Sequence, residues 1–410
     1  MELSRESTAQ FYLYPTMECS LSCHHCFIHE EIRKSKMSMT VEQCKHVVDE
    51  YAKYFHSVPD AGAEITIMGG EPSLLKPSFY EEVIPYIREK FNRNGKQGYI
   101  TLMTNFLHVP ALEKTHHLFD FISTSFEPNR FTSYNKSTNL DKKYETWEKN
   151  LKGWIDAGRI VTLSFTTTED VINEGVALFD RFFELGVRYF QINKAYPEGE
   201  YLKNIMTEEQ AKEHAQFRND ERYKPVRNRK VIKVYDSNQL FADFEKETQF
   251  LIDATKWMTE KINAGVFVSV DPLSRYPEGI RKNHELDDEA CGARKGFSVR
   301  GDGCVTGCAS EIGNKDILSW GNIWEQDLAE IAESKERKDF LNLQKRVSAK
   351  CIRCEYYTQC KGGCIIRSRL WDHTKDGECH SNKGYLKWVD ENIDELLIVM
   401  EKVEELRDDY

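Results

Sequence analysis

The chain has 410 residues, which is enough for two or three domains or for one α/β barrel with an addition. Lysine and arginine total 56 against 67 aspartates and glutamates, and the net charge of −11 argues against nucleic-acid binding as the main function. No segment approaches the ~18 consecutive apolar residues of a membrane span, and the first residues form no secretory signal. We therefore expect a cytoplasmic protein with no membrane or nucleic-acid partner. Its twelve cysteines then need an explanation other than disulfide bonds.

Strand and helix signals alternate through the first half of the chain. Short segments rich in β-branched and aromatic residues predict strands at 11–17, 64–68, 99–103, 121–124, 160–165 and 188–192. Helical periodicity predicts helices at 38–55, 79–91, 111–118, 142–156 and 174–185. Six β-α units of this kind form a parallel sheet, as a partial (βα)6 barrel or as a doubly wound sheet.

Polar residues follow every predicted strand, and they favour the barrel. The carboxyl ends of barrel strands converge on one mouth, where barrel enzymes place their chemistry, whereas a doubly wound sheet spreads them along an edge. The residues concerned are Cys19, Met68-Gly69-Gly70-Glu71-Pro72, Thr104-Asn105, Ser125-Phe126-Glu127, Thr166-Thr167 and Gln191-Ile192-Asn193.

The first predicted helix has a clear beginning and one cysteine. Residues 38–40, followed by Glu42 and Gln43, match a capping signature. Cys44 falls in step with the apolar residues of this helix, so we expect a buried apolar side chain there.

After residue 196 the alternation stops. Residues 200–262 are highly charged and predict helices with loops, notably over 243–262. We expect a hairpin over 297–305 and an amphipathic helix over 385–406 that packs on the rest of the protein. One cation-rich stretch is either a solvated surface or a dock for an acidic peptide; it contains Arg222, Lys224, Arg227, Arg229, Lys230 and Lys233.

Three early cysteines form a compact motif, Cys19-x3-Cys23-x2-Cys26. Structural zinc and a closed [4Fe–4S] cluster each require four ligands, so three thiolates leave one metal position open. A zinc site remains an alternative on spacing alone, with its fourth ligand from His24, His25 or His29.

Together with Gly69-Gly70-Glu71-Pro72 after the second strand, this motif resembles the radical S-adenosylmethionine superfamily. The resemblance implies a [4Fe–4S] cluster on the three cysteines, whose open iron binds S-adenosylmethionine. It also implies that the two glycines let backbone carbonyls approach the methionine ammonium group.

Other positions resemble further cofactor contacts of the superfamily. Thr104-Asn105 resembles the pair after the third strand, with Phe106 in place of the usual glycine, and His25 occupies a position usually aromatic. Lys136 falls where relatives carry arginine, whose bidentate fork lysine cannot reproduce. The resemblance thus implies cofactor contacts from Gly69, Gly70, Glu71, Pro72, Thr104, Asn105, Ser125, Glu127, Lys136 and Asn193.

The late cysteines resemble the seven-cysteine SPASM extension of the superfamily, although two four-thiolate zinc sites are an alternative. The resemblance implies two auxiliary [4Fe–4S] clusters and therefore three clusters, or about twelve irons, in the chain. One would use Cys351, Cys354, Cys360 and Cys379; the other would use Cys291, Cys308 and Cys364, with Cys304 as a possible fourth ligand or a buried bystander.

The resemblance divides the chain into four parts. We predict a partial barrel over 1–195, a helical linker or insert over 196–285, the SPASM domain over 286–381 and a C-terminal helix over 382–410.

The implied activity is radical oxidation. A reduced cluster would cleave S-adenosylmethionine to methionine and a 5′-deoxyadenosyl radical, which removes hydrogen from a substrate. SPASM relatives mostly modify peptides, so we expect a ribosomally made peptide that is crosslinked, epimerised or dehydrogenated. The alternatives are a small amino-sugar dehydrogenase, an anaerobic sulfatase maturase and an iron–sulfur electron-transfer or scaffold protein without turnover.

Two features bear on these alternatives. Sulfatase maturases carry an aspartate, proposed as the base, directly after the hairpin cysteine, whereas Ala309 follows Cys308 here. The first motif cysteine is residue 19, so we expect any leader-recognition domain on a separate protein. A reductase, flavodoxin or ferredoxin is the expected electron donor.

Overall fold

The fold is that of a computed structural model. It describes residues 8–23, 25–57, 62–92, 98–128, 140–196, 199, 244–286, 292–294, 296–313, 319–344, 349–364, 379 and 382–408.

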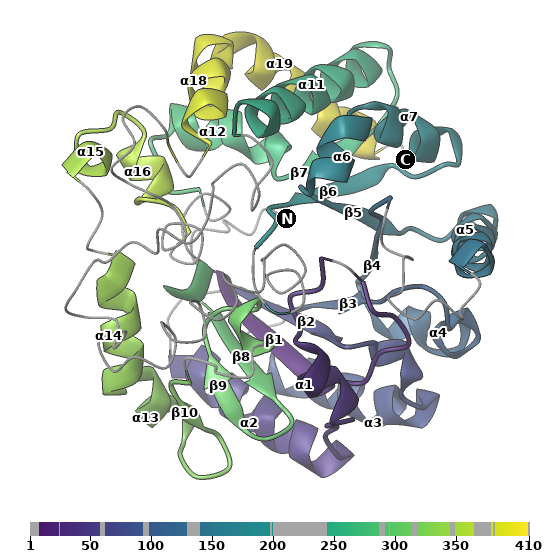
Figure 1. The fold of residues 1–410 in the computed structure, drawn as a ribbon, viewed down its shortest axis with the longest axis vertical. Helices are drawn as coiled ribbons and strands as arrows, with labels where there is room; N and C mark the ends of the chain where they lie inside the picture. The colour runs from purple at the N-terminus through teal and green to yellow at the C-terminus, as the bar shows by residue number, and fades with distance from the viewer. Residues whose placement is uncertain are drawn as a thin grey trace, which may run out of the picture.

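Six parallel strands form the centre of one sheet, which confirms the alternation predicted from the sequence. Because they run in one direction, their carboxyl ends lie at one edge of the sheet (Figure 1). The strands are β1 (Thr8–Thr16), β2 (Gly62–Gly69), β3 (Tyr99–Met103), β4 (Phe121–Ser125), β5 (Thr162–Thr166) and β6 (Tyr189–Asn193).

Helices cover the outer face of this sheet (Figure 1). Alternate strand residues pack against them; the Phe11 ring of β1, for example, lies 4.6 Å from the Tyr51 ring of α2. The other face of the strands is the inner, polar face of a partial barrel. The helices that follow β1 to β5 are α1 (Glu30–Lys34), α2 (Val41–Ser57), α3 (Pro77–Lys90), α4 (Val109–Thr115), α5 (Leu140–Asp156), α6 (Glu169–Glu174) and α7 (Ala177–Glu184).

The start of α2 confirms the predicted cap. The Thr40 hydroxyl accepts a hydrogen bond from the Gln43 N–H (3.2 Å), and the Gln43 carboxamide oxygen accepts one from the Thr40 N–H (2.9 Å). These reciprocal bonds satisfy two backbone donors that a helix end would leave unpaired. Cys44 is fully buried, as its spacing predicted.

The sheet continues beyond both edges of the predicted barrel. β7 (Ser269–Asp271) adds parallel to β6, and β8 (Gly296–Arg300) adds parallel to β1. β8 and β9 (Cys304–Thr306) form the predicted hairpin, and β10 (Gly321–Asn322) pairs with β9. One ten-stranded sheet therefore joins the predicted barrel to the cysteine-rich region.

One predicted helix is preceded by a helix that the sequence did not predict, and another is divided in two. The helix predicted over 174–185 is α7; α6 ends at Glu174 and is separated from it at Gly175, which has a φ of 60° that favours glycine. The helix predicted over 385–406 is α18 (Lys383–Glu391) and α19 (Ile393–Asp408). Between them, the Asn392 carboxamide donates to the Trp388 carbonyl (2.7 Å), and this side-chain bond competes with the helical pattern.

The C-terminal helices pack on the helix that follows the undescribed stretch after residue 199. The Thr255 hydroxyl of α11 lies 2.8 Å from the Tyr385 hydroxyl of α18, and the two helices are adjacent in Figure 1. No helix in the described ranges is both long and apolar enough to cross a membrane. The remaining helices are α11 (Phe244–Asn263), α12 (Tyr276–Arg281), α13 (Leu328–Ala332), α14 (Lys335–Gln344), α15 (Ala349–Ile352) and α16 (Tyr357–Cys360).

Candidate functional site

The loop after β2 is pressed against the segment that leads into the early cysteines. The Gly70 N–H donates to the Thr16 carbonyl (3.0 Å). A Cβ on Gly69, whose φ is 146°, would lie 2.1 Å from the Thr16 oxygen, and one on Gly70 would lie 2.3 Å from the Glu18 oxygen. No side chain fits either position, so both glycines are required to hold this segment at the mouth of the barrel.

Glu71 links three chain segments through buried hydrogen bonds. Its carboxylate, which is 0% exposed, accepts bonds from the Ser73 N–H (2.9 Å), the Thr104 hydroxyl (2.6 Å) and the Asn105 N–H (2.5 Å). Its own N–H donates to the Glu18 carbonyl (2.7 Å). The ends of β1, β2 and β3 are therefore fixed to one another around one carboxylate.

The Asn105 side chain extends this network to the first cysteine. Its Nδ2 donates to the Ser20 hydroxyl (3.3 Å) and lies 3.9 Å from the Cys19 sulfur. A carboxamide N–H next to a cysteine sulfur is a donor suited to a thiolate.

Phe106 adopts a backbone conformation that is unusual for its residue type. Its φ is 62°, in the left-handed region that glycine occupies without strain. The ring is fully buried and lies 5.3 Å from the Trp154 ring, and the Phe106 carbonyl accepts a bond from the Asn150 side chain (2.9 Å). Packing and this bond thus hold phenylalanine where the resembling proteins carry glycine.

Cys19 lies in an environment that disfavours a free thiolate. Burial, together with the nearby Cys23 and Glu71, raises the pKa of its thiol to about 12, against the opposing effects of the Leu21 N–H and Arg33. The buried Arg33 donates a hydrogen bond to the Leu21 carbonyl (2.7 Å) and so fixes the loop between Cys19 and Cys23. Metal binding at this thiol therefore requires release of its proton.

The loop after β4 meets the cysteine loop at a second point. His25 Nε2 lies 3.0 Å from the buried Glu127 carboxylate, whose other oxygen accepts a bond from the Thr166 N–H (3.2 Å). Ser125 and Asn193 end β4 and β6 at the same edge of the sheet. Glu127 is therefore engaged with protein groups on both of its oxygens.

A chain of hydroxyl and amide groups lines the inner face below this mouth. Ser123 and Ser164 lie 3.2 Å apart through their hydroxyls, and Ser164 donates to the Gln191 side chain (3.0 Å). The interior of the barrel is thus polar, in contrast to its helix-covered outer face.

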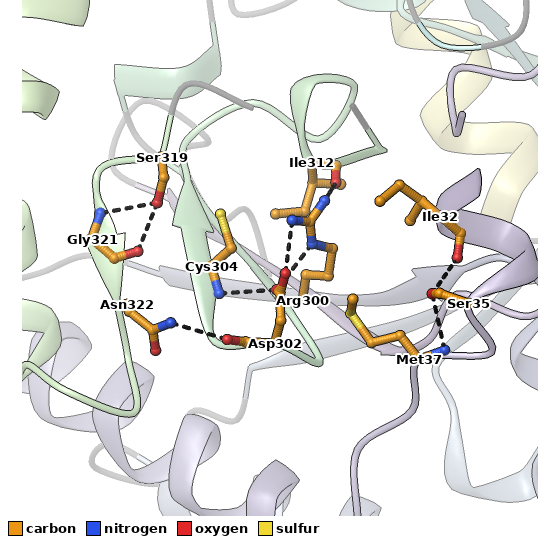
Figure 2. Close-up of polar contacts among 10 residues, drawn as sticks. All are labelled: Ile32, Ser35, Met37, Arg300, Asp302, Cys304, Ile312, Ser319, Gly321 and Asn322. Atoms are coloured by element: carbon orange, nitrogen blue, oxygen red, sulfur yellow. Dashed lines mark hydrogen bonds and ion pairs between the residues drawn. The ribbon is translucent and has the colours of Figure 1, made fainter. Parts of the chain in front are cut away.

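The loop after the hairpin is bonded to the inner face beside the mouth. The Tyr14 hydroxyl of β1 donates to the Ala309 carbonyl (2.8 Å), and Arg300 of β8 donates to the Ile312 carbonyl (2.9 Å; Figure 2). Tyr14 and Arg300 lie side by side in the parallel register of β1 and β8. Two neighbouring strands thus hold both ends of the short segment that follows Cys308.

This segment also contacts the cysteine loop directly. The His29 N–H donates to the Gly313 carbonyl (2.9 Å). A Cβ on Gly313 would lie 2.8 Å from the Phe27 oxygen, so the chain after Cys26 and the chain after Cys308 are in backbone contact.

Cys304 lies inside the hairpin. It is 7% exposed, its N–H donates to the Asp302 carboxylate (3.2 Å), and Figure 2 shows its sulfur directed away from that turn. Burial raises the pKa of its thiol, against which a hydrogen bond with Ser319 and the charge of Arg300 act.

The other late cysteines are spread over short elements. Among the residues that the structure describes, no three His, Cys, Asp or Glu side chains are arranged to hold a metal ion, so the ligand sets stay predictions. Lys136, Cys291, His24 and the cation-rich stretch lie outside the described residues. Those described and partly buried are Cys351, Cys354, Cys360, Cys364 and Cys379.

Comparisons with known proteins agree with this arrangement. Residues 291–361 match the SPASM family model, described as an iron–sulfur cluster-binding domain. The chain is 24% identical over 393 residues to the cysteine-type anaerobic sulfatase-maturating enzyme of Clostridium perfringens, covering 90% of this chain and 93% of that protein. Its fold matches that of anSMEcpe with bound AdoMet and Kp18Cys peptide at a TM-score of 0.69 (17% identity, 96% and 99% of the two chains). These comparisons confirm the resemblance to radical S-adenosylmethionine enzymes that carry a SPASM domain.

A second solved structure with a bound peptide is also similar. Streptococcus suis SuiB bound to its precursor peptide SuiA matches at a TM-score of 0.54 (16% identity), over 88% of this chain and 72% of SuiB.

Three supporting residues could not be predicted from the sequence. Arg33, Tyr14 and Arg300 belong to no motif, and they bond to backbone carbonyls that lie 12, 295 and 12 positions away in the sequence. The position of Tyr14 and Arg300 near the ends of strands, next to the cysteine motifs, is a signal that could have indicated them.

Proposed function

We propose that this chain cleaves S-adenosylmethionine reductively and uses the resulting radical to modify a peptide. Cys19, Cys23 and Cys26 would hold a [4Fe–4S] cluster and leave one iron open for the cosubstrate. When bound, this cluster supplies the electron that breaks the sulfonium bond.

The observation that carries the proposal is the Glu71 network. It fixes the glycine pair, Thr104 and Asn105 against the Cys19 segment, which supports a cofactor site at this mouth of the barrel. The residues present fit the group: the two glycines let the Thr16 and Glu18 carbonyls pack against the loop after β2, and Asn105 directs a donor toward the Cys19 sulfur.

The residues of the chain then have separate roles. Glu71 and Arg33 orient the two loops that would hold the cluster and the cosubstrate. We propose that the cosubstrate is contacted by Gly69, Gly70, Glu71, Pro72, Thr104, Asn105, Ser125, Glu127, Lys136 and Asn193. Besides this contact, Glu127 would position His25, because its carboxylate lies 3.0 Å from His25 Nε2.

We propose two auxiliary [4Fe–4S] clusters in the SPASM domain. Such clusters suit an oxidative outcome, because they accept the electron left on a product radical. One would use Cys351, Cys354, Cys360 and Cys379; the other would use Cys291, Cys308 and Cys364, with Cys304 as its fourth ligand. A reductase, flavodoxin or ferredoxin would supply electrons to the Cys19 site.

A peptide substrate is supported by the peptide-bound relatives anSMEcpe and SuiB. Sulfatase maturation is the second candidate, because the sulfatase-maturating enzyme of Clostridium perfringens is similar along 90% of this chain. Ala309 is the observation against it. Its side chain lies in an apolar cluster with Tyr14 and Ile312 and offers no proton acceptor.

The test uses anaerobically reconstituted protein. We expect about twelve irons, falling to about eight when Cys19, Cys23 and Cys26 are all replaced by alanine, with complete loss of 5′-deoxyadenosine formation. Adding a cysteine-containing sulfatase peptide separates the candidates by mass spectrometry, because formylglycine formation converts the CH2SH side chain to CHO, with loss of sulfur and two hydrogens and gain of one oxygen. Stoichiometric zinc with no iron would contradict the proposal.

A further inference from the structure

Among the residues that the structure describes, two buried hydroxyl groups of the hairpin find no hydrogen-bond partner. Ser298 and Thr306 are both 0% exposed, and within the described part of the chain neither hydroxyl meets a donor or acceptor. A buried hydroxyl without a partner keeps the full cost of leaving water. Such a pair therefore points to a group that is absent from the polypeptide itself.

The two hydroxyls lie on the same side of the sheet. Ser298 and Thr306 are directly opposite in the antiparallel pairing of β8 and β9. Their strand neighbours Phe297, Val299 and Val305 belong to the core on the helix-covered face. Because strand side chains alternate, Ser298 and Thr306 face the inner side of the sheet.

The same side carries the segment that follows Cys308. Arg300, two residues after Ser298, donates to the Ile312 carbonyl there (Figure 2). Thr306 precedes Cys308 by two residues. The hydroxyls of Ser298 and Thr306 and the Cys308 thiol are thus near the open end of the hairpin, opposite its turn.

We infer that Ser298 and Thr306 donate O–H···S hydrogen bonds to the auxiliary cluster at Cys308. The inference rests on the proposed function, because it requires that cluster. Hydrogen bonds to cluster sulfurs stabilise the more negative, reduced state and raise the reduction potential. Ser298 and Thr306 are positioning residues that tune this site for accepting an electron.

The decisive experiment is a potentiometric titration of the reconstituted full chain, followed by electron paramagnetic resonance. The test variant combines Ser298→Ala with Thr306→Val. Its auxiliary cluster should have a lower potential than in the parent, while the signal of the Cys19 cluster and its iron content stay unchanged. Thr306→Ser keeps a hydroxyl and should retain the potential of the parent.

Thr115→Val is the matched control. Thr115 is also 0% exposed, but its hydroxyl donates to the Ala111 carbonyl (3.2 Å) on the remote helix α4. This change should leave every potential where it is in the parent.

A second readout uses metal-free protein and does not depend on reconstitution of the variant. Without the cluster, the Ser298→Ala and Thr306→Val changes remove unpartnered hydroxyls, so the thermal midpoint should not fall. Thr115→Val removes a satisfied hydrogen bond and should lower it. A fall in the double variant equal to that of the control would overturn the inference.

The outcomes separate the two levels of the proposal. Three clusters with an unchanged auxiliary potential in the double variant would overturn the role of Ser298 and Thr306 and leave the proposed function intact. A parent protein that assembles no auxiliary cluster would overturn both.

Discussion

The Tyr14 hydroxyl donates a 2.8 Å hydrogen bond to the Ala309 carbonyl, across 295 positions of sequence. Tyr14 comes from the first strand of the barrel, and Ala309 directly follows a predicted cluster ligand. The position of the Cys308 segment is therefore set by the same strand that leads into Cys19.

Replacing Tyr14 by phenylalanine tests this bond. Tyr14 is fully buried, so the change keeps the ring and leaves a carbonyl unpaired; metal-free protein should lose about 1–2 kcal/mol of unfolding free energy. Denaturant unfolding measures the loss. Tyr54→Phe is the control, because the Tyr54 hydroxyl bonds no group among the described residues while its ring packs on Phe297. Equal stability of the two variants would contradict the role of the Tyr14 bond.

Gly70→Ala should damage the mouth of the barrel. The new Cβ would lie 2.3 Å from both the Met17 and Glu18 oxygens, which are backbone atoms and cannot rotate away. We expect a loss of about 1–3 kcal/mol and lower iron occupancy at the Cys19 site. Gly153 on α5 has nothing within 4 Å of its Cβ position, so Gly153→Ala should instead gain about 0.5–1 kcal/mol. An undisturbed iron content in Gly70→Ala would show that the contact is not restrictive.

At Phe106 we expect the glycine variant to be more stable than the alanine variant, the reverse of the usual order. Removing the buried ring should cost about 3–5 kcal/mol in either variant. At a φ of 62°, however, glycine avoids a strain of about 1–2 kcal/mol that alanine keeps. Phe106→Gly should therefore be more stable than Phe106→Ala in urea unfolding. Finding alanine the more stable would mean that the backbone relaxes once the ring is gone.

The contacts of Asp180 between two outer helices predict how the stability of the protein depends on pH. The Asp180 carboxylate accepts a bond from the Trp257 indole (2.8 Å) and lies 3.0 Å from the Lys261 ammonium, and these contacts lower its pKa. A lowered folded-state pKa contributes stability at neutral pH that is lost as pH falls through it. Because Asp180 is half exposed, Asp180→Asn should cost well under ~1 kcal/mol at pH 7.

The sign is checked by repeating the unfolding measurement in acid. The difference between Asp180→Asn and the parent should shrink as pH falls through the lowered pKa of Asp180, because the protonated carboxyl is then neutral like the amide. A difference that persisted in acid would assign the effect to packing.

Local patterns predicted the barrel strands because each carries its own signal of β-branched residues between turn residues. They predicted the Thr40–Gln43 cap for the same reason. β7 was not predicted, because it has only three residues and is a strand only through its pairing with β6. The break at Asn392 depends on one side-chain bond, which a helical apolar pattern does not reveal.

In the site, motif residues were predictable but their supports were not. The resemblance implied that Gly69 and Gly70 make room for a cofactor, and the structure adds a second reason, the carbonyls of Thr16 and Glu18. Tyr14 and Arg300 could not be predicted, because nothing in the local sequence indicates that β8 pairs with β1.

That pairing has a consequence for biosynthesis. Gln10 of β1 lies opposite Gly296 of β8, so the ribosome must add 286 residues before the first strand receives its second neighbour. At a translation rate of roughly 5–20 residues per second, one edge of β1 remains unpaired for about 15–60 s. During that interval an unpaired strand edge is open to other chains. Slow elongation or truncation before residue 296 should therefore favour aggregation over a smaller folded protein.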